Sequence, residues 1–135
     1  MAPRTFTPDE ANAALTQVRP LAEELVARAA DLRRAQAAQS ELDLHISGNG
    51  GDIAPMDLAE AEEAVQAAAR AVAETIARLD ELGVQVKDAD TGLLDFPADR
   101  HGEPVLLCWR LGEEEVGFWH DLDGGYAGRQ PLPFD

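Results

Sequence analysis

The C-terminal third of the chain holds the residue types with the most versatile chemistry. Both tryptophans, the only cysteine, the only tyrosine and one of the three histidines fall between Pro104 and Arg129. Apolar runs at Val105–Trp109 and Val116–His120 flank a turn-forming stretch, Gly112–Glu115, and this pattern predicts a β-hairpin. The main candidate sites therefore involve this hairpin.

A candidate metal site at the end of the hairpin consists of His120, Cys108, Asp121 and Asp123. Residues two apart in a strand share a face, so Phe118 and His120 face the same side. A three-residue tip places Cys108 opposite Phe118 and Leu106 opposite His120. Cys108 and His120 are then diagonal neighbours within reach of one ion. A two-residue tip reverses this register and separates them.

The chemistry of this set is that of a transition-metal site. A further carboxylate can come from the neighbouring turns, at Asp88, Asp90 or Asp95, and a histidine with carboxylates suits zinc, iron or manganese. The chain contains none of the metal-binding spacings CxxC, HxH or HExxH. The competing interpretation is structural: His120 ends a strand and bonds a backbone carbonyl, while Cys108 is a small apolar core residue.

A second candidate site would bind a ligand through arginines or aromatic rings. Arg110 and Arg129, beside the glycine-rich stretch Asp123–Gly128, can hold a carboxylate or a phosphate. In so acidic a chain they can instead pair with its own carboxylates. The aromatic side chains can form a ligand or partner surface, or the core against which the helices pack; they are Trp109, Trp119, Phe118 and Tyr126.

A long helical segment is expected to frame these sites from the N-terminal side. Thr7 and Glu10 have the spacing of a capping box, and Pro8 falls at the first helical position. Apolar residues then recur at a spacing near 3.5, which predicts a helical segment at 7–47. Pro20 removes one backbone hydrogen bond and should kink or split this segment.

The rest of the chain changes from helical to extended patterning. A glycine-rich turn at Ser47–Asp52 precedes a second predicted helix at 55–82, which folds back on the first as an antiparallel hairpin. Short alternating runs then predict an antiparallel β-meander at 84–120, followed by an irregular, packed tail at 121–135. We therefore expect one α+β domain spanning residues 1–135.

Composition narrows the classes of partner. The chain carries 26 acidic and 11 basic residues and a net charge of −15, which argues against nucleic acid and anionic membranes as partners. The N-terminus lacks the apolar region of a secretory signal, and no run approaches the roughly 18 apolar residues of a membrane span. A single cysteine excludes an internal disulfide and fits a reducing compartment. We expect a cytoplasmic protein.

Four segments resemble a prokaryotic family known as domain of unknown function 2203. They are FTPDEANAAL, VRPLAEEL, LGVQVKDADTGLLDFPA and LCWRLGEEEVGFWHDLDGGYAGRQPL. The resemblance runs from end to end of the chain, and the last segment is its most specific part. It implies a long helical region followed by a small β region, and it implies no activity and no functional residues.

Two functional classes follow from these patterns. The first is a non-enzymatic homo-oligomer that self-associates through its helical hairpin, as a dimer or four-helix arrangement, and binds a protein partner or a small anionic ligand. The alternative is a metal-binding protein or metal-dependent enzyme with zinc, iron or manganese near His120. No motif in the sequence fixes a reaction.

Overall fold

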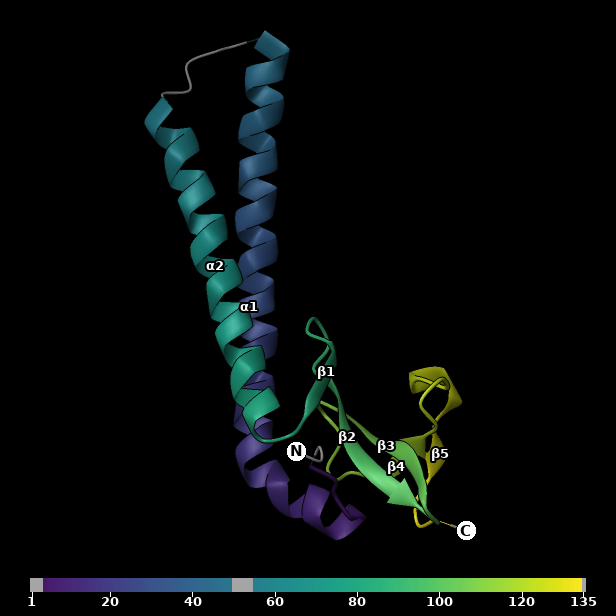
Figure 1. The fold of residues 1–135 in the computed structure, drawn as a ribbon. Coiled ribbons are helices and arrows are strands. Elements are labelled where there is room, and N and C mark those ends of the chain that lie inside the picture. Colours follow the sequence, from purple (N-terminus) through teal and green to yellow (C-terminus); the bar gives the residue numbers. More distant parts are fainter. Residues whose placement is uncertain (1–3, 50–54, 135) are drawn as a thin grey trace.

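A helical hairpin and a small antiparallel sheet make up the protein. The structure is a computed structural model that describes the backbone of residues 4–49 and 55–134 and the side chains of residues 4–44 and 57–134. Its elements are α1 (Pro8–Asn49), α2 (Pro55–Glu81), β1 (Gln85–Asp88), β2 (Leu93–Arg100), β3 (Glu103–Arg110), β4 (Phe118–His120), a 3₁₀ helix (Tyr126–Gly128) and β5 (Gln130–Pro131). The strands pair antiparallel in the order β1-β2-β3-β4-β5 (Figure 1). The predicted α+β fold is confirmed. The turn predicted at Ser47–Asp52 extends into residues outside the described ranges.

The start of α1 is fixed by the capping box that the sequence predicts. The Thr7 backbone N–H donates to Glu10 Oε1 at 2.9 Å, and the Glu10 N–H donates to Thr7 Oγ1 at 3.1 Å. These two bonds satisfy donors that a helix start otherwise leaves free. The helix runs through Pro20 without a break, and Figure 1 shows it changing direction in its N-terminal part, coloured purple.

The hydrophobic core lies between the first half of α1, the last turns of α2 and one face of the sheet. We call this the inner face; its fully buried members include Leu94, Phe96, Leu107 and Trp109. Phe6, just before α1, packs edge-on against Phe96 at 5.2 Å between ring centroids. Burial of large apolar side chains from three elements is the main force that holds the sheet to the helices.

Strand β2 runs through a proline, Pro97, and continues to Arg100. On one side Pro97 lies opposite Leu106 of β3, while on the other side the last partner from β1 is Gln85, opposite Asp95. The missing N–H of Pro97 therefore costs no ladder bond, and its carbonyl accepts from Phe6 N–H at 2.7 Å.

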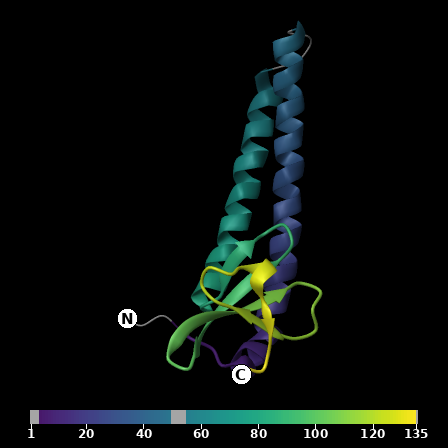
Figure 2. The same ribbon diagram turned by 90° about the vertical axis from the view of Figure 1, so that its right-hand side faces the viewer.

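The opposite, outer face of the sheet is crossed by the C-terminal tail. Figure 2 shows the tail (yellow) in front of the sheet, on the side away from the helices. The tail was expected to be irregular, and most of it is, but Gln130–Pro131 adds the edge strand β5 next to β4. Within residues 4–49 and 55–134, neither helix is long and apolar enough to cross a lipid bilayer.

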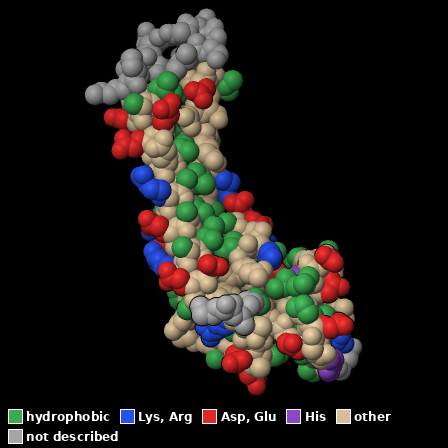
Figure 3. All heavy atoms as spheres, viewed as in Figure 1, with side chains coloured by type: hydrophobic (Ala, Val, Ile, Leu, Met, Phe, Trp, Pro, Cys, Tyr) green, Lys and Arg blue, Asp and Glu red, His purple; other side chains and the backbone are tan. Residues whose placement is uncertain are grey.

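The half of the hairpin farthest from the sheet is packed much more thinly. Among its described side chains, at 30–44 of α1 and 57–74 of α2, none is fully buried. Leu32, Leu42, Leu58 and Val65 are half-buried in the seam between the two helices. Figure 3 shows hydrophobic side chains following this seam at the surface. We refer to this half of the hairpin as the arm.

Candidate metal centre

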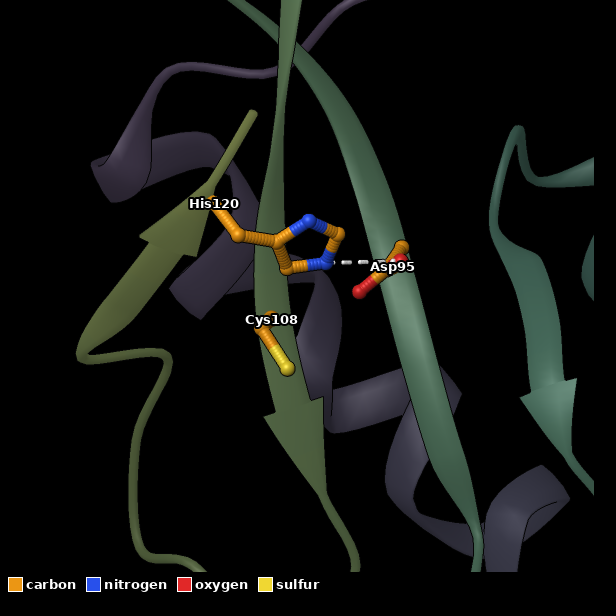
Figure 4. A group of neighbouring side chains, drawn as sticks. All are labelled: Asp95, Cys108 and His120. Atoms are coloured by element: carbon orange, nitrogen blue, oxygen red, sulfur yellow. Dashed lines mark hydrogen bonds and ion pairs between the residues drawn. The ribbon is translucent and has the colours of Figure 1, made fainter. Parts of the chain in front are cut away.

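Strand register brings three side chains of the outer face together. Cys108 lies opposite Phe118 and Leu106 opposite His120, which is the register that a three-residue hairpin tip predicts. On its other side Cys108 lies opposite Asp95 of β2. Directly opposed residues share a face, so Asp95, Cys108 and His120 project from three neighbouring strands to the same side. Figure 4 shows the His120 ring reaching across β3 towards Asp95, with the Cys108 sulfur beside it.

The hydrogen bonds of His120 define what each of its ring nitrogens does. Nδ1 lies 2.6 Å from the carbonyl oxygen of Asp121, which can only accept, so Nδ1 carries a proton and donates it. Nε2 lies 3.0 Å from Asp95 Oδ2. Two electron-rich atoms so close need a positive partner between them, either a proton or a metal ion.

The three side chains of the cluster are almost fully buried, and one of their polar atoms lacks a hydrogen-bond partner among the residues that the structure describes. Asp95, Cys108 and His120 are 1%, 1% and 2% exposed. Oδ1 of Asp95 is buried and forms no hydrogen bond within the described part of the chain. Burial raises the pKa of Asp95, against the lowering effect of His120 and of Lys87. A buried polar atom without a partner is rare, and a bound ion is one way to satisfy it.

The three side chains have the spacing that metal binding needs. One ligand atom from each of Asp95, Cys108 and His120 lies within 4.8 Å of the other two. Ligand atoms around a tetrahedral zinc lie roughly 3.3–3.7 Å apart, given bonds of about 2.0–2.3 Å. The widest separation therefore has to close by roughly 1 Å, which side-chain rotation supplies. The Nδ1 bond to a backbone carbonyl is the orientation that zinc-binding histidines usually have.

Arg129 and Glu113 form an ion pair beside Cys108. Arg129 donates to both carboxylate oxygens of Glu113, at 3.0 and 2.6 Å, and lies 3.8 Å from Cys108 Sγ. Burial raises the pKa of the Cys108 thiol to about 11. A thiol with so high a pKa stays protonated at neutral pH, which argues against a free nucleophilic cysteine. Arg129 is thus engaged with Glu113 rather than presented to an external anion.

The other predicted site residues divide between the two faces of the sheet. Trp109 and Trp119 lie on the inner face, 0% and 6% exposed, and the Trp109 indole N–H donates to the Glu113 carbonyl. Tyr126 lies with Arg110 and Arg129 at the outer face, where both guanidinium groups approach its ring. The aromatic set therefore does not form one surface.

The two carboxylates predicted with His120 lie at the edge of the cluster. Asp121 and Asp123 are exposed, and Asp121 Oδ1 accepts from the Asp123 N–H. Asp121 contributes its backbone carbonyl to His120 instead of its side chain. The carboxylate that lies next to His120 is that of Asp95. A signal for it existed in the sequence, because an acid within the apolar run Leu93–Phe96 is expected to be buried and paired.

The fold and site together define a class: an α+β protein with a helical hairpin and a five-stranded sheet that buries a His–Asp–Cys cluster. The profile of the uncharacterized conserved protein family DUF2203 matches residues 4–132, nearly the whole chain. The protein belongs to this family, as the resemblance of its four segments implies. No curated protein and no solved structure matches the chain.

Proposed function

We propose that this protein binds a divalent transition metal, most favourably zinc, through Asp95, Cys108 and His120. The observation that carries the proposal is the buried convergence of three potential ligand atoms within 4.8 Å. One thiolate, one carboxylate and one neutral imidazole suit zinc, and the two negative ligands balance its charge inside the protein. Three protein ligands leave a fourth position free, which is the arrangement of catalytic rather than structural zinc sites.

The free position would face a small cavity. A pocket of about 180 Å³ is lined by Asp95 and His120 together with Lys87, Leu106 and Tyr126, among others. A molecule in this pocket would lie against two of the three metal ligands. The proposed centre is therefore accessible to a small molecule although its ligands are buried.

Elemental analysis of the purified, untagged protein tests this proposal. We expect close to one zinc per chain after loading, and loss of that zinc in His120→Ala and Asp95→Asn. The matched control is His101→Ala, which removes an exposed histidine from the turn between β2 and β3. In cobalt(II)-loaded protein, a thiolate-to-metal charge-transfer band should disappear in Cys108→Ser. Parent protein that takes up no stoichiometric metal, or a His120→Ala variant that keeps it, overturns the proposal.

We propose as a second candidate function that the arm pairs with a second copy of the chain. The observation that favours it is the absence of any fully buried side chain among the described residues of the arm. Two helices bury only one seam between them, and a four-helix arrangement would bury the apolar side chains left at its edges. Leu44, near the end of the arm, is 72% exposed.

The charges of the arm favour an antiparallel pair. Its outer end is acidic, with Glu41, Asp43, Asp57, Glu60, Glu62 and Glu63, whereas the middle of the hairpin carries Arg28, Arg33, Arg34 and Arg70. Figure 3 shows red side chains near the far end of the arm and both blue and red ones along the middle of the hairpin. An antiparallel partner brings the acidic end of one copy to the arginines of the other, while a parallel one places acid against acid.

Native mass and sedimentation measure this association. We expect a dimer that dissociates in Val65→Glu, which places a charge in the seam of the arm, and that persists in Gln66→Glu, which places the same charge on the exposed side. Far-ultraviolet circular dichroism reports whether each variant keeps its helices. A monomeric parent protein at high concentration and low salt would rule out this second function.

A further inference from the structure

A groove on the outer face runs along both sides of Tyr126. On one side is the pocket of about 180 Å³ beside Asp95 and His120, and on the other is a pocket of about 190 Å³ lined by Asp88, Thr91, Leu93, Arg110 and Tyr126. Leu93 and Tyr126 line both pockets. The two pockets are therefore parts of one continuous surface that leads to the buried cluster.

Two cationic side chains line this groove without an ion pair to any residue that the structure describes. Lys87 is the only lysine of the chain, and it lines the pocket beside Asp95. Arg110 lines the pocket on the other side of Tyr126. Within the described residues, the side-chain nitrogens of Lys87 and Arg110 form neither an ion pair nor a hydrogen bond.

Most of the other cations are engaged. Seven arginines donate to carboxylates or carbonyls, namely Arg4, Arg19, Arg28, Arg33, Arg34, Arg78 and Arg129. With 26 acidic residues against 11 basic ones, most cations should find a carboxylate nearby. Lys87 and Arg110 thus lie at one groove without an ion pair in the described ranges, and the Arg110 guanidinium lies 6.0 Å from the centre of the Tyr126 ring.

The groove also exposes apolar side chains. Only three large hydrophobic residues in the described part of the chain are strongly exposed, and two of them, Leu122 and Tyr126, line the pocket beside His120. Exposed apolar groups concentrated at a concave site are typical of a surface that a ligand covers. The groove therefore combines apolar contacts with two cationic side chains, Lys87 and Arg110, alongside the carboxylates of Asp88, Asp95 and Asp123.

Two of the three acidic side chains that line the groove form hydrogen bonds within the protein. Asp95 pairs with His120, and Asp88 accepts from the Thr91 hydroxyl and the Asp90 N–H. Asp123 is the acid that remains exposed at the rim of the pocket. It opposes an anion there, and its removal should strengthen anion binding.

We propose that this groove binds a small organic anion, with its carboxylate or similar oxyanion attracted by Lys87 on one side of Tyr126 and by Arg110 on the other, and its apolar part against Leu122 and Tyr126. The inference rests on the proposed metal centre in one respect: the bound molecule lies next to the open metal position and is the substrate or regulator of that site. Recognition of the anion itself needs only the protein side chains.

Benzoate is a suitable probe because it combines a carboxylate with an apolar ring, and benzamide is its uncharged match. We expect saturable benzoate binding by calorimetry, with benzamide at least about tenfold weaker, the loss expected for one charge-assisted contact. Lys87→Gln and Arg110→Gln should each weaken benzoate several-fold, and Asp123→Asn should tighten it. Arg70→Gln, which removes an exposed arginine from the arm, is the control and should change nothing.

The experiment is run on both metal-free and zinc-loaded protein, so that two failures can be told apart. Benzoate binding that depends on Lys87 in a protein that takes up no zinc supports the groove and overturns the metal centre. Zinc uptake without saturable benzoate binding, equal affinity for benzoate and benzamide, or indifference to Lys87→Gln overturns the groove as an anion site and leaves the metal centre standing.

Discussion

Both faces of the sheet contain fully buried side chains, but those side chains differ in chemistry. On the inner face, Phe96 and Trp109 are 0% exposed and pack against helices. On the outer face, Asp95 and His120 are just as buried, yet they are ionisable. A core needs only apolar burial, and polar groups in its place bring a desolvation cost. Apolar burial accounts for the inner face, whereas the buried ionisable groups of the outer face are the basis of the proposed metal centre.

The largest effect is expected from a truncation on the inner face. Phe96→Ala removes a fully buried ring that also contacts Phe6, and it should lower the free energy of unfolding by about 3–5 kcal/mol. Phe118→Ala is the matched change on the outer face and should cost less, because its side chain is only half-buried. Urea unfolding measures both. Equal losses in the free energy of unfolding would contradict the view that the inner face contributes more to stability than the outer face.

Removing the charged pair of the outer face should affect stability less and metal binding completely. In metal-free protein, Asp95→Ala leaves His120 without its partner and should cost about 1–3 kcal/mol. The double change Asp95→Val with His120→Leu should restore unfolding to within about 2 kcal/mol of the parent, since buried ion pairs are often replaceable by apolar groups. The double variant should still take up no zinc, because two of the three proposed ligands are gone.

The same double variant discriminates between two roles of the cluster. A double variant clearly less stable than Asp95→Ala would show that the pair stabilises the fold more than apolar side chains in its place do. Urea unfolding with elemental analysis on the same samples gives the answer. A double variant that still binds zinc would show that the metal is held elsewhere.

Much of this arrangement could be predicted from the sequence, and the residues show why. The cap at Thr7 and Glu10 and the change of period after Gly83 depend on neighbours in sequence, so local rules find them. The hairpin register could be stated only as two alternatives, because one residue in the tip reverses every side chain. The structure has the alternative that brings Cys108 next to His120.

The rest of the site depends on contacts that no local pattern encodes. Asp95 joins the cluster through pairing with β3, so it was one of three equivalent carboxylates before the register was known. Glu113 was counted among the residues of a turn, yet it binds Arg129 through both carboxylate oxygens across the hairpin. Lys87 is conspicuous in the sequence as the single lysine, but only the folded structure places it in one pocket with Leu122 and Tyr126 of the tail.

The smallest effect is expected at the cap of α1, which belongs to neither face. Hydrogen bonds between Glu10 and Thr7 lower the pKa of Glu10 below the ordinary value of 4.5. A lowered folded-state pKa stabilises the fold above the unfolded-state pKa, and this stabilisation is lost as pH falls through the lowered value. Glu10→Ala should therefore be measurably less stable than the parent at pH 6, and the difference should shrink below about pH 4. Glu23→Ala, an exposed acid farther along α1, should show no such pH dependence. Zinc uptake should be unchanged in both variants, because the cap acts on α1 and the inner face alone. A loss of zinc in Glu10→Ala would mean that the two faces are coupled through the sheet.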